Sequence, residues 1–167
     1  MAINDIEFTE FASARWMTLV RAAVLLGSSV AEAEDLAQVT LTKCYLSWSR
    51  VQRADNIEAY VSRILLNSFR ASRRRRWWGE EPTAEIPEAP QPTSRDVETE
   101  LMVQSALKQL SQGQREVVVL RLLMNLSEQQ TADALSVAVG TVKSRLARAT
   151  AQLSSDPTLS DLRSTGG

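Results

Sequence analysis

The stretch SEQQTADALSVAVGTVKSRLARATAQL, residues 127–153, decides the fold of the C-terminal half of this 167-residue chain. Its first four residues, Ser127–Gln130, form a capping-box signature, so a short helix is expected from here to about Leu135. A five-residue turn, Ser136–Gly140, then precedes a second helix over Thr141–Leu153. Two helices joined by so short a turn are typical of a helix-turn-helix unit, whose second helix enters the major groove of DNA.

The second of these helices has two different faces. Apolar residues at steps of four, three and four fall on one side and are expected to pack inward, namely Val142, Leu146, Ala149 and Leu153. The other side and its flanks carry Thr141, Lys143, Ser144, Arg145 and Arg148. Such basic side chains can donate to guanine O6 and N7, and Ser or Thr can bond phosphates or bases. We predict a DNA-reading surface, although an amphipathic helix with a solvated basic face has the same pattern.

Helical spacing also extends upstream of this unit. A helix is predicted over Val97–Leu110, and a further capping box at Ser111–Gln114 begins the next one. The residues of the first that are expected to point inward are Leu101, Ala106, Leu107 and Leu110. The C-terminal half is therefore predicted to be entirely helical.

The N-terminal half has the same character. Apolar residues at helical spacing over Phe8–Leu26 predict a first helix, and a capping box at Ser29–Glu32 begins a second. After a polar segment, 50–55, Asn56 is the expected N-cap of a third helix that ends in the sequence RRRRWW, residues 73–78. Because no segment of the chain has the alternation of a strand, we predict an all-α fold.

Proline and acidic residues separate the two halves. The segment 79–96 holds four prolines among acids, a composition that can neither continue a helix nor bury a core. We predict two small helical domains, 1–78 and 97–153, joined by this linker and followed by a disordered tail, 154–167. The linker can span at most about 60 Å. It is either a simple tether or a segment with contacts of its own.

Charge is segregated along the chain, so the net charge of −1 is misleading. Residues 1–79 hold 11 Lys and Arg against 8 Asp and Glu, and residues 101–153 hold 6 against 3. Between them, residues 80–100 hold one Arg against seven acids. Two basic lobes therefore flank an acidic connector.

The composition argues against most enzyme chemistry. The chain has no histidine, and Cys44 is its single cysteine. Disulfides, Cys/His zinc sites and His-based triads are thus excluded within one chain, and we expect no cofactor, no metal and no small-molecule substrate. Cys44 lies among apolar positions and is expected to be a packed, inert thiol rather than a redox sensor. Without a signal peptide or a membrane span, a cytoplasmic location is expected.

A second candidate nucleic-acid surface lies in the N-terminal half. Arg70 and the run Arg73–Arg76 supply up to five phosphate contacts at the end of one helix. The nearby aromatic residues are Trp48, Tyr60, Trp77 and Trp78. Aromatic rings beside cations suit unstacked, single-stranded bases. For Trp48 and Tyr60 the alternative is a packing role in the core. Trp77 and Trp78, which are adjacent in the sequence, are instead expected to be exposed.

Two motifs then carry a family resemblance. The segment AEDLAQ, residues 33–38, resembles the polymerase-binding helix of sigma factors, and GTVKSRLARA, residues 140–149, resembles the recognition helix of their last domain. The similarity extends over residues 5–153. A two-domain arrangement resembles the extracytoplasmic-function group of the bacterial sigma-70 family. This resemblance implies a non-catalytic subunit that directs core RNA polymerase to promoters.

The resemblance also implies roles for individual residues. Asp35, Leu36 and Gln38 would contact the polymerase clamp helices. The segment 50–56 would capture a flipped base of the minus-ten element, with Arg53, Asp55 and Asn56 as readers. Asn67, Arg70, Arg73, Arg74 and the adjacent arginines would hold the melted strand and the duplex next to it. Thr141, Lys143, Ser144, Arg145 and Arg148 would read the minus-thirty-five element. The linker would lie in polymerase channels, and an anti-sigma factor is a further implied partner.

The chain departs from the family pattern at several positions. Val39 and Leu41 stand where relatives commonly have an acid and an aromatic residue. Ser136 replaces a frequent glycine of the turn, and Thr131 replaces an aliphatic residue, so a buried Thr131 hydroxyl would need a backbone partner. The alternative function is a stand-alone helix-turn-helix regulator that binds duplex DNA as a dimer without polymerase.

Overall fold

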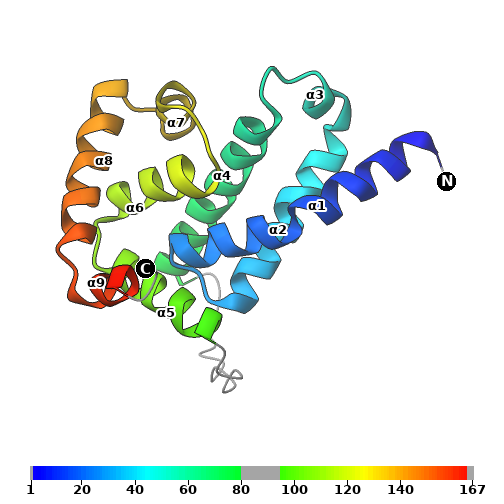
Figure 1. The fold of residues 1–167 in the computed structure, drawn as a ribbon. Coiled ribbons are helices and arrows are strands. Elements are labelled where there is room, and N and C mark those ends of the chain that lie inside the picture. Colours follow the sequence, from blue (N-terminus) through cyan, green and yellow to red (C-terminus); the bar gives the residue numbers. More distant parts are fainter. Residues whose placement is uncertain (1, 80–94, 165–167) are drawn as a thin grey trace.

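The computed structural model describes residues 2–79 and 95–164, and every regular element within them is a helix (Figure 1). The elements are α1 (Ile3–Leu26), α2 (Val30–Leu46), α3 (Trp48–Gln52), α4 (Ile57–Trp77), α5 (Arg95–Lys108), α6 (Gln112–Val118), the π-helical η1 (Val119–Leu123), α7 (Glu128–Leu135), α8 (Val139–Ser154) and α9 (Pro157–Ser164). The predicted all-α fold is confirmed. We call residues 2–79 the N-terminal part and residues 95–164 the C-terminal part. The predicted linker, 79–96, falls almost wholly outside the described residues.

Serine caps define where three of these helices begin. Ser29, Ser111 and Ser127 each accept a hydrogen bond from the backbone N–H three residues later, and the side chain of that later residue accepts one in return. Each cap thereby satisfies two backbone donors that the helix itself leaves free. The capping boxes predicted from the sequence are confirmed at all three positions.

The core of the N-terminal part lies between α1, α2 and α4. Figure 1 shows α1 and α2 side by side, with α4 running between them and the C-terminal part. Trp48 packs edge-on against Phe8 and Phe11, with ring centroids 5.3 and 4.9 Å apart, which confirms its core role. Cys44 is fully buried, as predicted for a packed thiol.

The C-terminal part is organised around α6, α7 and α8. α7 and α8 form the predicted helix-turn-helix, and the chain reverses between them because Ser136 adopts a left-handed conformation, φ 55°. The Val137 N–H closes the end of α7 by donating to the carbonyl of Ala132 at 3.1 Å. Thr131 is buried, and its hydroxyl donates to the Ser127 carbonyl at 2.8 Å, the backbone partner that the sequence required.

Three details of the sequence prediction are corrected. The tail is helical over α9, because Pro157 suits a first helical position and Asp156 accepts a hydrogen bond from the Thr158 N–H at 2.9 Å. The polar segment after residue 49 is helical as far as Gln52 in α3, which the fully buried Val51 anchors. Leu101 is 55% exposed, because a separation of six residues places it about 120° around α5 from the buried Leu107.

The two parts pack against each other through polar contacts at several points. The Arg115 guanidinium of α6 donates to the carbonyl of Leu26, at the end of α1, at 3.2 Å, and to that of Leu107, in α5, at 3.0 Å. Burial lowers the pKa of Arg115, and the nearby charge of Arg73 lowers it further. Arg21 of α1 also pairs with Glu100 of α5 at 3.0 Å. The end of α1 is therefore held by the C-terminal part.

In both described ranges, no helix combines the length and the apolar character needed to cross a membrane.

Candidate nucleic-acid interface

α8 presents a solvent-facing side that we call the recognition face. It consists of the five residues predicted from the sequence, Thr141, Lys143, Ser144, Arg145 and Arg148. Val142 and Ala149 are fully buried on the opposite side and fix the helix against α6 and α7. Lys143, Ser144 and Arg148 are exposed, whereas the other two residues of the recognition face are partly buried. The predicted inward and outward sides of this helix are confirmed, while the DNA-reading role stays a prediction.

Two residues of the recognition face have contacts within the chain. Arg145 lies over the start of α6, where a Cβ atom added to Gly113 would be only 3.1 Å from the Arg145 Cζ atom. Lys143 is 3.7 Å from a carboxylate oxygen of Glu128, the first residue of α7. The Arg145 side chain is thus held near the start of α6, and the Lys143 side chain near the start of α7. Arg148 is exposed one turn further along α8.

A second group of residues follows one side of α4, and we call it the α4 stripe. With about 100° of rotation per residue, its members fall within an arc of roughly 100°. They are Arg63, Asn67, Arg70, Arg74, Trp77 and Trp78. Three of these, Asn67, Arg70 and Arg74, are residues predicted to hold melted DNA. The helix thus brings together side chains that the sequence analysis identified separately.

The C-terminal part contacts two arginines of the α4 stripe, Arg63 and Arg70. The Arg70 guanidinium donates to both carboxylate oxygens of Glu116, from Nε at 3.2 Å and from Nη2 at 2.8 Å. The Glu116 side chain is only 4% exposed, and its hydrogen bond raises the pKa of Arg70. Two turns earlier on α4, Arg63 donates to the backbone carbonyl of Asp133 in α7 at 3.1 Å. In this arrangement Arg70 is occupied by α6.

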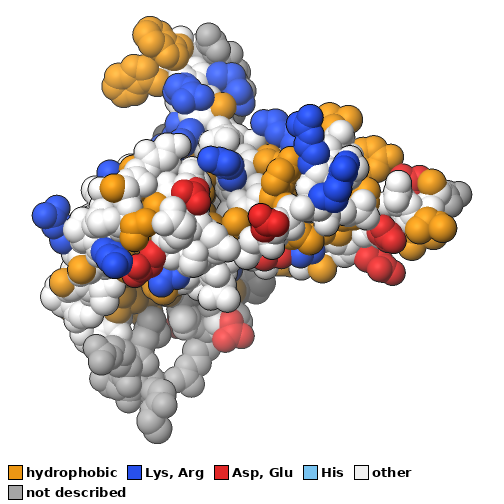
Figure 2. All heavy atoms as spheres, turned by 90° about the horizontal axis from the view of Figure 1, so that it is seen from above, with side chains coloured by type: hydrophobic (Ala, Val, Ile, Leu, Met, Phe, Trp, Pro, Cys, Tyr) orange, Lys and Arg blue, Asp and Glu red, His pale blue; other side chains and the backbone are white. Residues whose placement is uncertain are grey.

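The remaining arginines at the end of α4 have separate surroundings. Arg73 lies over the Phe69 ring at 5.2 Å, and Arg76 forms an ion pair with Glu32 at the start of α2. Arg74 is exposed. The predicted exposure of the two terminal tryptophans is confirmed, at 86% for Trp77 and 75% for Trp78. Figure 2 shows hydrophobic side chains projecting beside Lys and Arg side chains at one edge of the molecule.

The loop before α4 holds the residues predicted to read a flipped base. Arg53, Asp55 and Asn56 are all exposed there. The Arg53 Nε donates to the Ser49 carbonyl at 2.9 Å, and the Asn56 side chain accepts from the Ala59 N–H at 2.8 Å. Asn56 is therefore the N-cap of α4, as predicted, in addition to any contact with DNA.

The predicted polymerase-binding residues of α2 separate into two classes. Asp35 and Gln38 are exposed, whereas Leu36 is 6% exposed and packs in the core, and the predicted contact of all three with polymerase stays a prediction. Two apolar residues of the same helix, Val39 and Leu46, are 43% and 79% exposed. An exposed apolar side beside polar residues is typical of a protein-binding surface.

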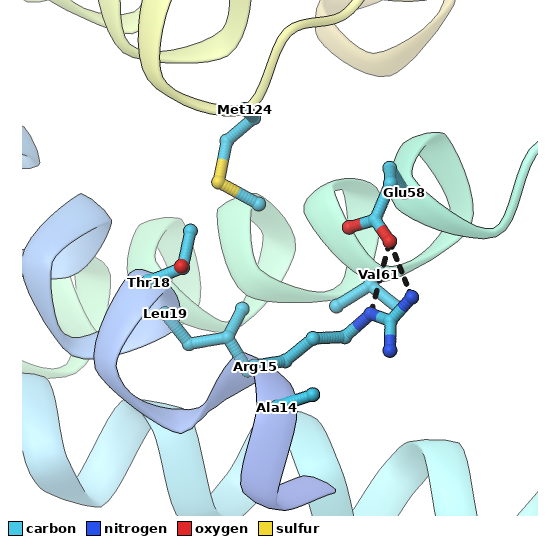
Figure 3. A pocket seen from close by; sticks show the side chains of 7 residues that line it. All are labelled: Ala14, Arg15, Thr18, Leu19, Glu58, Val61 and Met124. Atoms are coloured by element: carbon cyan, nitrogen blue, oxygen red, sulfur yellow. Dashed lines mark hydrogen bonds and ion pairs between the residues drawn. The ribbon is translucent and has the colours of Figure 1, made fainter. Parts of the chain in front are cut away.

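A cavity of about 280 Å³ lies where the two parts meet (Figure 3). Arg15 and Glu58 point toward one another across it and are joined by hydrogen bonds of 2.5 and 3.0 Å, while Met124 reaches in from the C-terminal part. The ion pair satisfies both charged groups. The described residues contain no cluster of three or more acidic or cysteine side chains that could bind a metal ion.

Sequence reasoning missed Glu116 and Arg115, which join the two parts. Glu116 begins a run of apolar residues, EVVVL, and a lone acid before such a run is a weak signal of a buried, paired carboxylate. Nothing in the sequence pointed to Arg115, whose partners are four backbone carbonyls and the side-chain oxygen of Gln112.

Two family comparisons bear on this geometry. Residues 15–79 match the family described as Sigma-70 region 2, and residues 100–153 match Sigma-70, region 4. The chain belongs to the sigma-70 family. The matched ranges contain the α4 stripe and the recognition face, respectively. The predicted sigma-factor function, in promoter-directed initiation of transcription, is confirmed at the level of the family.

Individual relatives place this sigma factor in the extracytoplasmic-function group. It is 34% identical over 163 residues to the RNA polymerase sigma-E factor of Streptomyces coelicolor, covering 94% of this chain and 89% of the relative. It is 32% identical over 136 residues to the ECF RNA polymerase sigma factor EcfG of Rhodopseudomonas palustris, covering 79% and 75%. A solved structure of the sigma factor RpoE in complex with the anti-sigma factor NepR, from Bartonella quintana, superposes with a TM-score of 0.67 at 29% identity, covering 86% and 94%.

Proposed function

We propose that this sigma factor divides promoter recognition between its two parts. The recognition face of α8 reads the duplex minus-thirty-five element. The loop before α4 binds the melted minus-ten region, together with Asn67 and the arginines of the α4 stripe. The observation that carries this proposal is the presence, in one chain, of an exposed basic helix-turn-helix face and a separate basic and aromatic helix. Duplex is read by hydrogen bonds in the major groove, whereas unstacked bases are bound on aromatic rings beside cations.

The residues predicted to bind DNA, and the exposed ones predicted to bind polymerase, have roles in this scheme. Arg53, Asp55 and Asn56 capture a flipped base, and Asn67, Arg70, Arg73 and Arg74 hold the strand and the adjacent duplex. Asp35 and Gln38, with the exposed apolar residues of α2, contact core RNA polymerase. The chain performs no covalent chemistry, because its contribution is the preferential binding of melted over duplex DNA. We propose that the protein binds polymerase and promoter DNA in the cytoplasm.

The packing of the two parts makes this proposal more specific. Arg70 cannot contact a phosphate while it is paired with Glu116. Binding to polymerase and promoter therefore separates α6 from α4 and releases the α4 stripe. A structural relative is held by an anti-sigma factor, and we propose an inhibitory protein of this kind as a further partner.

The decisive experiment is transcription of a genomic DNA library by core RNA polymerase, with and without this protein, followed by mapping of start sites. The expected result is a set of new start sites that share two spaced upstream elements. A stand-alone regulator would instead bind DNA as a dimer and give no new start sites with core polymerase. That outcome would contradict the proposal.

A further inference from the structure

We propose that Trp77 and Trp78, which we call the tryptophan tip, form a separate binding site for unstacked bases of single-stranded nucleic acid. This inference rests on the proposed function, since it assigns nucleic acid to α4. It goes further by adding a site at the end of α4 opposite the base-reading loop. The helix has 21 residues, so the two sites lie about 30 Å apart and cannot bind the same base.

The exposure of the tryptophan tip is the first argument. Trp77 and Trp78 are 86% and 75% exposed, whereas the other two tryptophans of the chain, Trp16 and Trp48, are partly buried and pack against the core. Two adjacent, solvent-facing indole rings leave a large apolar area in water, which is unfavourable unless a partner covers it.

The backbone keeps both rings at the surface. α4 ends with Trp78 as its C-cap, and Gly79 follows in a left-handed conformation, φ 71°. Glycine adopts this conformation without strain, so the chain can turn away immediately after the rings. Successive helical positions differ by about 100°, so the two indoles point in different directions. Such a pair suits separate bases better than one flat protein surface.

The positive charge beside the tryptophan tip favours nucleic acid as the partner. Arg73 and Arg74 each precede one tryptophan by four residues, so an arginine lies one helical turn below each ring. Both arginines are exposed. A cation one turn from an aromatic ring is the arrangement in which a phosphate can be bound while its base is stacked. An apolar protein partner would not need this alternation of rings and cations.

The tryptophan tip is highly exposed, whereas two arginines of the α4 stripe make contacts with the C-terminal part. Arg63 and Arg70 are engaged by α7 and α6, but the tip and Arg74 extend beyond these contacts. The tip should therefore bind single-stranded DNA in the free protein, without separation of α6 from α4.

The test measures binding of the free, full-length protein to a labelled oligothymidylate and to a duplex of mixed sequence, by fluorescence anisotropy. W77A/W78A is expected to lose affinity for the single strand by about 5-fold to 150-fold for each stacked base. Its duplex affinity should stay close to that of the wild type. R73A/R74A should weaken binding of both the single strand and the duplex. For the single strand, the slope of log affinity against log salt should become shallower by about 1.4, because each lost phosphate contact removes roughly 0.7.

Two further variants make the result specific. W77L/W78L keeps an apolar surface but no aromatic ring, so it should bind as weakly as the alanine pair. M17A removes an exposed apolar side chain of α1, which is 73% exposed, and should bind like the wild type. Wild-type affinity for the single strand in W77A/W78A or in W77L/W78L would overturn the proposal.

The outcome is independent of the sigma-factor assignment. If W77A/W78A binds the single strand normally while the wild type still directs new start sites with core polymerase, the tryptophan tip is not a nucleic-acid site and the proposed function stands. If the same variant instead loses affinity for core polymerase, the tip is a protein-binding surface, and the proposal is again overturned. If binding of the single strand depends on the tip but no new start sites appear with core polymerase, the proposed function fails and the tip remains a nucleic-acid site.

Discussion

Arg70 of α4 and Glu116 of α6 form a bidentate ion pair that joins the N-terminal and C-terminal parts, with the Glu116 carboxylate almost fully buried. Gln112 adds a third hydrogen bond to the same carboxylate at 3.3 Å. A buried carboxylate needs such partners, because its desolvation is costly. The pair therefore opposes the use of Arg70 on DNA for as long as the two parts stay together.

Replacing Glu116 with Gln should make Arg70 available to DNA. The neutral side chain attracts the guanidinium less, so α6 should separate from α4 more readily. We expect tighter binding of duplex DNA by the free protein, with a slope of log affinity against log salt that is steeper by about 0.9, the value for one extra phosphate contact. The measurement is a salt series by fluorescence anisotropy.

The matched control for this variant is E100Q. Glu100 also joins the two parts, through Arg21, but that pair is exposed and should contribute little. E100Q is expected to keep the wild-type slope. An unchanged slope in E116Q, with circular dichroism showing a folded protein, would mean that the pair does not restrict Arg70.

The sequence was sufficient to predict features that depend on local chemistry and periodicity. The cap at Ser127 and the burial of Val142 and Ala149 follow from side-chain type and helical spacing alone, and the structure has them as predicted. The pairing of Arg70 with Glu116 depends instead on how α4 and α6 dock, 46 residues apart in the chain. Local patterns contain no information on that docking.

The same distinction applies to the candidate site. Periodicity predicted which residues of α8 point outward, and the position of Trp77 and Trp78 at the edge of the predicted domain indicated that they are exposed. The contacts of Arg63 and Arg70 with the C-terminal part could not be predicted, because they result from packing between helices. The roles of all these residues toward DNA and polymerase remain predictions.

Arg148→Ala should weaken the use of the upstream element. Arg148 is exposed on the recognition face, and loss of one base contact is expected to cost about 1–3 kcal/mol of discrimination. The measurement is transcription in vitro from a promoter with an intact or a scrambled upstream element. K108A removes an exposed charge from α5 and is the control. Equal sensitivity of both variants to the scrambled element would contradict a reading role for Arg148.

Ser136→Gly should stabilise the protein. Ser136 has φ 55°, a left-handed conformation in which a Cβ atom is unfavourable and glycine is not. We expect an increase of about 0.5–1 kcal/mol in the free energy of unfolding in urea. Ser155, the C-cap of α8, has φ −91°, so Ser155→Gly should not stabilise. A gain of similar size at both positions would argue against relief of strain at Ser136.

Burial raises the pKa of the Cys44 thiol from 9.0 to about 11, and the charge of Arg15 opposes this with a smaller effect. The unfolded chain releases the thiol proton at lower pH than the folded chain. The contribution to stability is therefore complete below pH 9.0 and is lost as the pH rises to about 11, by at most about 3 kcal/mol. Urea unfolding across this interval should show a steeper decline for the wild type than for Cys44→Ala. Parallel declines would mean that the thiol does not contribute.

Asn56 offers a way to separate a structural role from a DNA-binding role. Its side chain caps α4 by accepting from the Ala59 N–H at 2.8 Å. Asn56→Ala removes the cap and should destabilise the protein by about 1 kcal/mol, in addition to impairing promoter opening. Asn56→Ser keeps a capping oxygen but has a shorter side chain without an amide.

Asn56→Ser should therefore retain stability near that of the wild type and still open promoters poorly. The measurements are urea unfolding and permanganate reactivity of the melted strand in complexes with core polymerase. A pre-melted promoter is the control, because it should restore transcription by Asn56→Ser only if the defect lies in opening. Normal opening by Asn56→Ser, with a defect only in Asn56→Ala, would mean that Asn56 acts through the stability of α4 and does not read a base.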